Sequence, residues 1–99
     1  MNTAVLPKMK VNLSNHAEKR MQQRGIPYLV IDWLYEYGES KHDHQGGEIL
    51  YFTKKSMRSL KRGVGSIIYR KVEHLLNSYL VESDGVVITV GRRYKRLHH

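Results

Sequence analysis

The segment Tyr79-Leu80-Val81-Glu82-Ser83-Asp84-Gly85-Val86-Val87-Ile88-Thr89-Val90 contains two runs of strand-forming residues separated by two turn residues. Asp-Gly is a strong signal for a two-residue hairpin turn, because both central residues of that turn need positive φ angles. The flanking runs, 79–83 and 86–90, are rich in residues that favour strands. The segment therefore predicts an antiparallel β-hairpin near the C-terminal end of the chain.

A helix is predicted over residues 15–24, near the other end of the chain. Asn15 is the expected N-cap, and Glu18 at the third helical position completes a capping box with it. Gly25 supplies the left-handed residue that ends the helix.

A second helix is predicted from Pro27, which suits a first helical turn, to Gly38. Only Asp32 and Glu36 interrupt its apolar and aromatic residues. A helix that is apolar on nearly every side is buried or covered by another chain, and we expect central burial here.

The middle of the chain contains a strand signal followed by two helix signals. Residues 40–47 read as a polar strand or loop, and 48–53 as a central strand with apolar residues on both faces. Thr53 is the expected cap of a short basic helix, and Ser66 opens another helix. Met57 and Leu60 are expected to point inward from the basic helix, and Ile68, Val72, Leu75, Leu76 and Tyr79 to share one face of the next.

The predicted element order is helix, helix, strand, helix, helix, strand, strand. It indicates an α+β domain in which N-terminal helices and a central helical pair pack on an antiparallel sheet of three or four strands. Residues 1–12 read as an N-terminal arm with at most one short extended piece, and 13–97 as a single domain. No membrane-spanning run, signal-peptide core or cysteine is present, so a cytoplasmic protein without membrane contact is expected.

The chain is strongly basic, with 17 Lys and Arg against 9 Asp and Glu and a net charge of +8. Such a charge attracts polyanions, which indicates nucleic acid or an acidic protein as the partner. The cations form two groups: Lys54, Lys55, Arg58, Lys61 and Arg62, and then Arg92, Arg93, Lys95 and Arg96. The plain alternative is that each group is a solvated face.

Helical spacing places His16, Arg20 and Arg24 in one stripe, next to an apolar stripe for core packing. A titratable imidazole beside two cations suggests a phosphate site. As alternatives, His16 would hydrogen-bond the backbone at the helix start, and the two arginines would form surface salt bridges with Glu18, Glu36 or Glu39.

Three motifs carry a family resemblance: His-Ala-x-x-Arg-Met-x-x-Arg-Gly-Ile at 16–26, Tyr-Phe-x-Lys-Lys at 51–55, and Val-Ile-Thr-Val-Gly-x-Arg-Tyr-Lys-Arg at 87–96. Together they resemble a family of small bacterial proteins whose domain is of unknown function. That family is grouped with the barnase-like and RelE-like fold, which includes ribonucleases of toxin–antitoxin systems. The match covers nearly the whole chain from Leu13.

The resemblance implies a metal-independent, toxin-type protein that cleaves or binds RNA, including ribosome-bound mRNA, and has an antitoxin or other protein partner. The family pattern singles out His16, Arg20 and Arg24 together with Thr89, Arg93 and Tyr94. Combined with the charge groups, the expected catalytic residues are His16, Arg20, Arg93 and Tyr94. The expected nucleic-acid-binding residues are Arg24, Lys54, Lys55, Arg58, Thr89, Arg92, Lys95 and Arg96.

In this scheme His16 serves as acid or base, the arginines clamp phosphate, and Tyr94 stacks a base or donates a proton. Many related sequences have histidine where this chain has Arg92. The loss of a second imidazole favours a non-catalytic module that binds nucleic acid or an acidic partner. A third hypothesis is a structural or accessory protein of phage or mobile-element origin.

Two further histidine groups are assigned no function. His42-Asp43-His44 supplies two metal ligands without a clear third, so a polar hairpin is favoured, and neither a metal nor another cofactor is expected. His98 and His99 are compatible with the remnant of a purification tag and are given no role.

Overall fold

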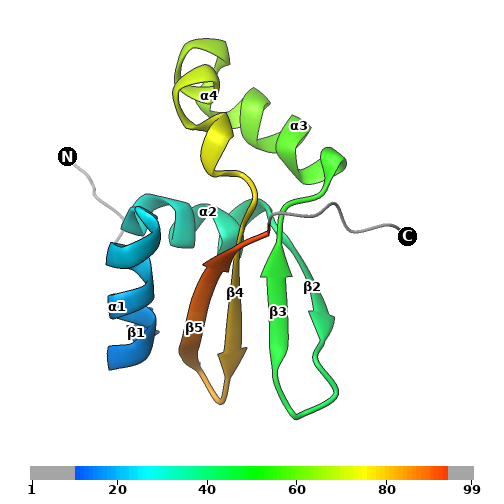
Figure 1. The fold of residues 1–99 in the computed structure, drawn as a ribbon. Coiled ribbons are helices and arrows are strands. Elements are labelled where there is room, and N and C mark those ends of the chain that lie inside the picture. Colours follow the sequence, from blue (N-terminus) through cyan, green and yellow to red (C-terminus); the bar gives the residue numbers. More distant parts are fainter. Residues whose placement is uncertain (1–10, 94–99) are drawn as a thin grey trace, which may run out of the picture.

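Five strands form one mixed sheet in the computed structural model, which describes residues 11–93 (Figure 1). Their order across the sheet is β1-β5-β4-β3-β2. The strands are β1 (Asn12–Leu13), β2 (Glu39–His42), β3 (Glu48–Tyr51), β4 (Ser78–Ser83) and β5 (Val86–Arg92). The α+β class is confirmed. The prediction of a purely antiparallel sheet of three or four strands is wrong, because β1 pairs parallel to β5. With two residues, β1 is too short for an alternating pattern.

Four α-helices occur within the described part of the chain. They are α1 (Asn15–Arg24), α2 (Tyr28–Tyr37), α3 (Lys54–Val64) and α4 (Ser66–Val72), and a 3-10 turn, η1 (Glu73–Leu75), follows α4. The predicted helices and strands occur in the predicted order, but the prediction lacked β1, which precedes α1, and left β2 undecided between strand and loop. The polar stretch that allowed either a strand or a loop contains the fully exposed edge strand β2 and then the turn into β3.

The predicted hairpin is present as β4 and β5. Asp84 and Gly85 have φ angles of 52° and 79°, the positive values that its two-residue turn requires. Beyond the turn the register shifts, so that Ile88 is the extra residue of a β-bulge and Val81 faces Thr89.

The core lies between α2 and one face of the sheet. Its buried residues include Val30, Ile31 and Leu34 of α2, Leu50 of β3, Leu80 of β4, and Val87 and Val90 of β5. Burial of α2 is therefore confirmed for one side of the helix. Tyr28 and Leu29 in its first turn remain exposed.

The cap of α1 differs from the prediction, although the helix bounds and the left-handed Gly25 are confirmed. Ser14, not Asn15, is the N-cap: its Oγ accepts a hydrogen bond of 3.0 Å from the Ala17 N–H. The same Oγ donates to the Ile88 carbonyl at 3.1 Å. Glu18 consequently lies one position too late for a capping box.

The basic helix α3 begins as predicted, with Thr53 as its cap and Ser56 completing a capping box. Leu60 is fully buried and Met57 packs against the core.

The single apolar face predicted for the following helix is wrong. The helix α4 ends at Val72 after seven residues, too few to align positions as far apart as 68 and 79 on one face. Ile68 is exposed, whereas Leu75 and Leu76 reach the core from η1 and its end, and Tyr79 belongs to β4.

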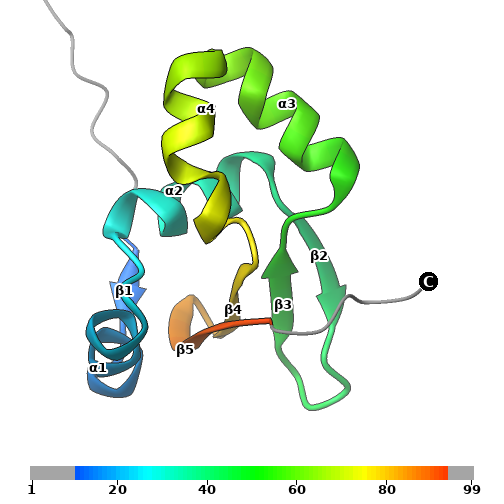
Figure 2. The same ribbon diagram turned by 45° about the horizontal axis from the view of Figure 1, so that its top comes forward.

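Together α3 and α4 form a helical hairpin that projects beyond the end of the sheet (Figures 1 and 2). None of the helices within residues 11–93 has the length and apolar character needed to cross a membrane.

Candidate nucleic-acid interface

The sheet has a second face, opposite the one that α2 covers. Tyr35 of α2 donates a hydrogen bond of 2.8 Å to Glu82, which lies on the same face as Leu80, so α2 packs on that side. Strand register assigns the alternate residues to the other side, which we call the open sheet face. It comprises Ile49 and Tyr51 of β3, Tyr79 and Val81 of β4, and Thr89 of β5.

Two tyrosines lie next to each other on the open sheet face. Tyr51 and Tyr79 are directly paired across β3 and β4, and Tyr79 in turn pairs with Gly91 of β5. A Cβ atom at Gly91 would lie only 2.8 Å from the Tyr79 Oη. Because Gly91 has no side chain, the Tyr79 ring can lie close over β5. Tyr51 itself is only 8% exposed, so the accessible member of this aromatic pair is the half-buried Tyr79. An exposed aromatic ring is a platform on which a nucleic-acid base can stack.

Arg93 lies at the end of this surface. Its Nη2 donates a hydrogen bond of 2.9 Å to the Phe52 carbonyl, and its guanidinium carbon is 5.2 Å from the centre of the Tyr51 ring. Its Nε is buried and has no hydrogen-bond partner among residues 11–93. Burial lowers the pKa of Arg93, and the nearby Tyr51 raises it by less. Within the same residues no carboxylate pairs with this guanidinium, which stays charged at neutral pH.

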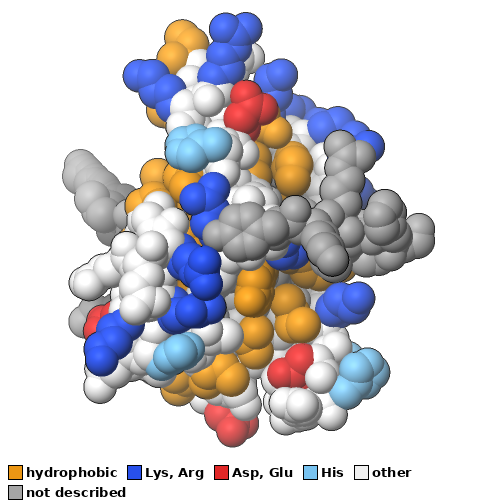
Figure 3. Space-filling model, in the orientation of Figure 1, with side chains coloured by type: hydrophobic (Ala, Val, Ile, Leu, Met, Phe, Trp, Pro, Cys, Tyr) orange, Lys and Arg blue, Asp and Glu red, His pale blue; other side chains and the backbone are white. Residues whose placement is uncertain are grey.

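The stripe of α1 borders the β5 side of the sheet. Ala17 and Met21 point into the core. His16, at the exposed start of the helix, lies on the same side as Arg20 and Arg24, and the Arg20 Nε is buried without a hydrogen-bond partner among the described residues. Figure 3 shows Lys and Arg side chains in a column along α1, beside hydrophobic side chains that lie over the strands.

Arg92 is placed differently from Arg93. Its Nε donates to the Asn77 Oδ1 at 3.1 Å, its Nη2 to the His74 carbonyl at 2.6 Å, and its Nη1 to the Arg24 carbonyl at 3.5 Å. These bonds join the end of α1 to the segment that precedes β4. A phosphate would have to compete with them.

The other predicted binding residues divide into two sets. Lys54, Lys55 and Arg58 are exposed on α3, whose N-cap Thr53 follows Phe52, the residue whose carbonyl accepts a hydrogen bond from Arg93. The start of α3 is therefore close in sequence to the carbonyl that holds Arg93. Thr89 is half-buried on the open sheet face. Tyr94, Lys95 and Arg96 lie outside the described residues.

In the His42-Asp43-His44 segment, His42 ends β2 and the other two residues begin the turn into β3. One Asp43 carboxylate oxygen accepts 2.8 Å hydrogen bonds from the Gln45 and Gly47 N–H groups, which lower the pKa of Asp43. No group of three His, Asp or Glu side chains within residues 11–93 has a metal-binding arrangement.

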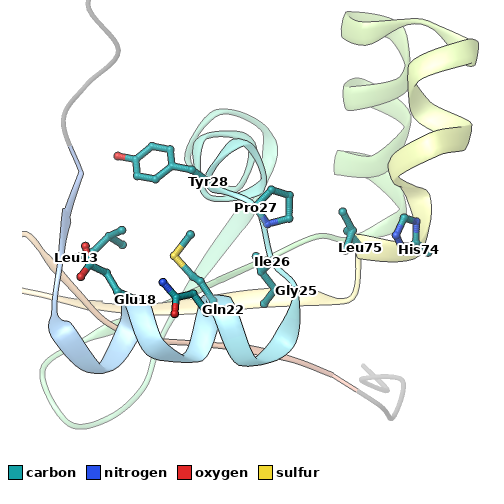
Figure 4. A pocket seen from close by; sticks show the side chains of 10 residues that line it. Leu13, Glu18, Gln22, Gly25, Ile26, Pro27, Tyr28, His74 and Leu75 are labelled. Atoms are coloured by element: carbon teal, nitrogen blue, oxygen red, sulfur yellow. The ribbon is translucent and has the colours of Figure 1, made fainter.

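A pocket of about 660 Å³ lies on the other side of α1, towards α2 (Figure 4). Leu13, Met21, Ile26 and Leu75 contribute apolar surface, and Glu18, Gln22 and His74 are its polar lining residues. The lining contains no Lys or Arg, so the pocket does not continue the cationic surface.

Sequence reasoning assigned no binding role to Tyr51, Tyr79 or Gly91. The alternation of residues 49 and 51 was the available signal for the first tyrosine. The positions of Tyr79 and Gly91 on this face follow only from the register of β3, β4 and β5. No family model, curated protein or solved structure matches the chain, so the candidate interface rests on these contacts.

Proposed function

We propose that this protein binds single-stranded RNA across the open sheet face. A base stacks on Tyr79, which the buried Tyr51 flanks, and phosphates contact Arg93 together with the arginines of α1. The observation that carries the proposal is the position of Arg93, a half-buried cation above Tyr51 with no paired carboxylate among residues 11–93. Burial of an unpaired charge is unfavourable, and a phosphate would offset that cost.

The proposal extends to the type of protein. The three sequence motifs resemble a family with a RelE-like or barnase-like fold, and the five-stranded α+β domain is compatible with that assignment. We therefore favour a toxin-type protein of a bacterial toxin–antitoxin or mobile-element system. It would act on cytoplasmic RNA, including ribosome-bound mRNA, and have an antitoxin-like protein partner.

Fluorescence anisotropy with a labelled single-stranded RNA tests the binding surface. Arg93→Gln should weaken affinity about five- to tenfold, and it should reduce the slope of log affinity against log salt by about 0.7. Tyr79→Leu should weaken affinity while leaving the salt slope unchanged, because stacking releases no counterions.

Arg62→Gln is the matched control, since it removes the same charge from the exposed end of α3. The proposal fails if Arg62→Gln and Arg93→Gln weaken binding equally, because the affinity would then depend only on the net charge of the protein. Circular dichroism of each variant establishes that it is folded.

RNA cleavage is a second candidate function, favoured by the exposed His16 beside Arg20 and Arg24. An imidazole there could take the proton of a ribose 2′-hydroxyl or supply one to the leaving 5′-oxygen. Wild type and His16→Ala should be incubated with RNA, with and without translating ribosomes. Cleavage that is lost in His16→Ala while binding persists would identify a ribonuclease. Intact RNA with the wild type in both conditions would leave RNA binding as the one proposed function.

A further inference from the structure

The end of the α3–α4 hairpin exposes two adjacent isoleucines. Ile67 is 76% exposed and Ile68 is 47% exposed, more than the other large hydrophobic residues in the described chain. Both belong to the first turn of α4, at the end of the hairpin that lies farthest from the strands (Figures 1 and 2). Neither isoleucine belongs to the core or packs against it, so core packing does not explain why these positions are apolar.

The same hairpin is strongly cationic. Residues 54–72 contain seven Lys and Arg and no Asp or Glu. Arg62 lies in the last turn of α3 and Arg70 and Lys71 in the last turn of α4, and all three are exposed. We call these three cations and the two isoleucines the hairpin tip. Figure 3 shows hydrophobic and cationic side chains next to each other at this end of the molecule.

Contacts on the opposite side of α4 attach the hairpin tip to the rest of the protein. Tyr69 and Val72 of α4 are half-buried and pack against the core, and the Lys61 ammonium lies 5.6 Å from the centre of the Tyr69 ring. These contacts fix the side of α4 that faces the protein. Ile67 and Ile68 consequently face solvent in the isolated protein.

We propose that the hairpin tip docks on an anionic lipid surface. Ile67 and Ile68 enter the boundary between headgroups and acyl chains, while Arg62, Arg70 and Lys71 contact lipid phosphates. The tip projects from the molecule, a shape that suits insertion into a soft surface. A second copy of the chain would bring two strongly cationic hairpins together, and RNA would use the cations but leave the isoleucines in water.

This docking differs from a membrane span. It needs only peripheral contact, so it is compatible with helices too short to cross a bilayer. It also involves a surface separate from the open sheet face, and the two proposals stand or fall independently.

Vesicle co-sedimentation tests the inference. The protein should partition at least tenfold more strongly onto mixed phosphatidylglycerol–phosphatidylcholine vesicles than onto pure phosphatidylcholine vesicles. The double variant Ile67→Ser, Ile68→Ser should lose most of this binding. Leu29→Ser is the matched control, because Leu29 is 43% exposed on α2, outside the tip, and should bind like the wild type. In Ile67→Trp, the added indole should show a blue-shifted emission on the anionic vesicles.

Four results would overturn the inference: equal partitioning onto both vesicle types, unchanged binding by the double variant, a loss of RNA affinity in that variant, or self-association that the double serine substitution abolishes. The third would assign the tip to RNA and the fourth to a second copy of the chain. Both isoleucines are exposed and outside the core, so the double variant should fold, and circular dichroism checks this.

Discussion

Adjacent arginines have different environments at the end of β5. Successive side chains of a strand point to opposite faces. Arg92 therefore reaches Asn77 and backbone carbonyls on one side, while Arg93 lies over Tyr51 on the other. Two residues of the same type, next to each other in a basic run, consequently have different physical roles. Arg92 stabilises the junction between α1 and β4, and Arg93 is positioned for an anion.

Tyr35 makes a pH-dependent contribution to stability. Its hydroxyl donates to Glu82, and burial together with that carboxylate raises the pKa of Tyr35 above its ordinary value of 10.0. The unfolded chain therefore loses the tyrosine proton at a lower pH than the folded protein does. The contribution is complete below pH 10.0 and is lost as the pH rises towards the folded-state pKa.

Tyr35→Phe should lower the free energy of unfolding by about 1 kcal/mol at neutral pH, because the hydrogen bond to Glu82 is lost. Above pH 10.0 the difference between the variant and the wild type should shrink. Urea denaturation across the alkaline range measures it. A difference that grows with pH would mean that Tyr35 does not carry this linkage.

At the scale of elements, the start of α1 and the bulge of β5 are held by one residue. Ser14 caps α1 through its Oγ, donates from that Oγ to the Ile88 carbonyl, and donates from its N–H to the Val87 carbonyl at 3.0 Å. The bulge at Ile88 is what brings Thr89 opposite Val81. A helix cap thus contributes to the side-chain arrangement of the open sheet face.

Ser14→Ala should destabilise the protein by about 1–2 kcal/mol, because it removes a helix cap and a second hydrogen bond to β5. Asn15→Ala is the control one residue away, and its effect should stay below about 0.5 kcal/mol because the side chain is exposed. Thermal or urea denaturation compares the two. Equal losses would contradict the assignment of Ser14 as the cap.

At the scale of the whole molecule, one core joins elements that are far apart in sequence. Leu60 of α3, Leu76 after η1 and Trp33 of α2 belong to the same buried cluster as the strands. The α3–α4 hairpin therefore projects from the sheet without having a core of its own. Its basic exposed face and the open sheet face are two surfaces on one folding unit.

Unfolding should consequently be a single cooperative transition. Trp33, which is only 7% exposed, reports the core by fluorescence, and far-ultraviolet circular dichroism reports all the helices. The two signals should give the same urea midpoint. Loss of helical signal before the tryptophan signal changes would show that the α3–α4 hairpin unfolds separately.

Local signals in the sequence determined most of the helices and the β4–β5 hairpin, together with several of their ends. Asp84-Gly85 makes the hairpin turn, Gly25 ends α1 and Thr53 starts α3, because each depends on backbone geometry within a few residues. The basic composition and the α1 stripe are likewise properties of the sequence. The choice between Ser14 and Asn15 as cap was beyond this local reasoning, since Ser14 is also bonded to a strand more than seventy residues away.

Only the tertiary structure decided how these elements combine into a surface. From the turn alone, an unbroken hairpin would place Ile88 opposite Val81, yet the bulge places Thr89 there. The pairing of β1 with β5 and the position of Arg93 over Tyr51 likewise join segments distant in sequence. Such contacts depend on packing and register throughout the sheet. The sequence therefore determined which residues are available for binding, and the fold determined which of them meet.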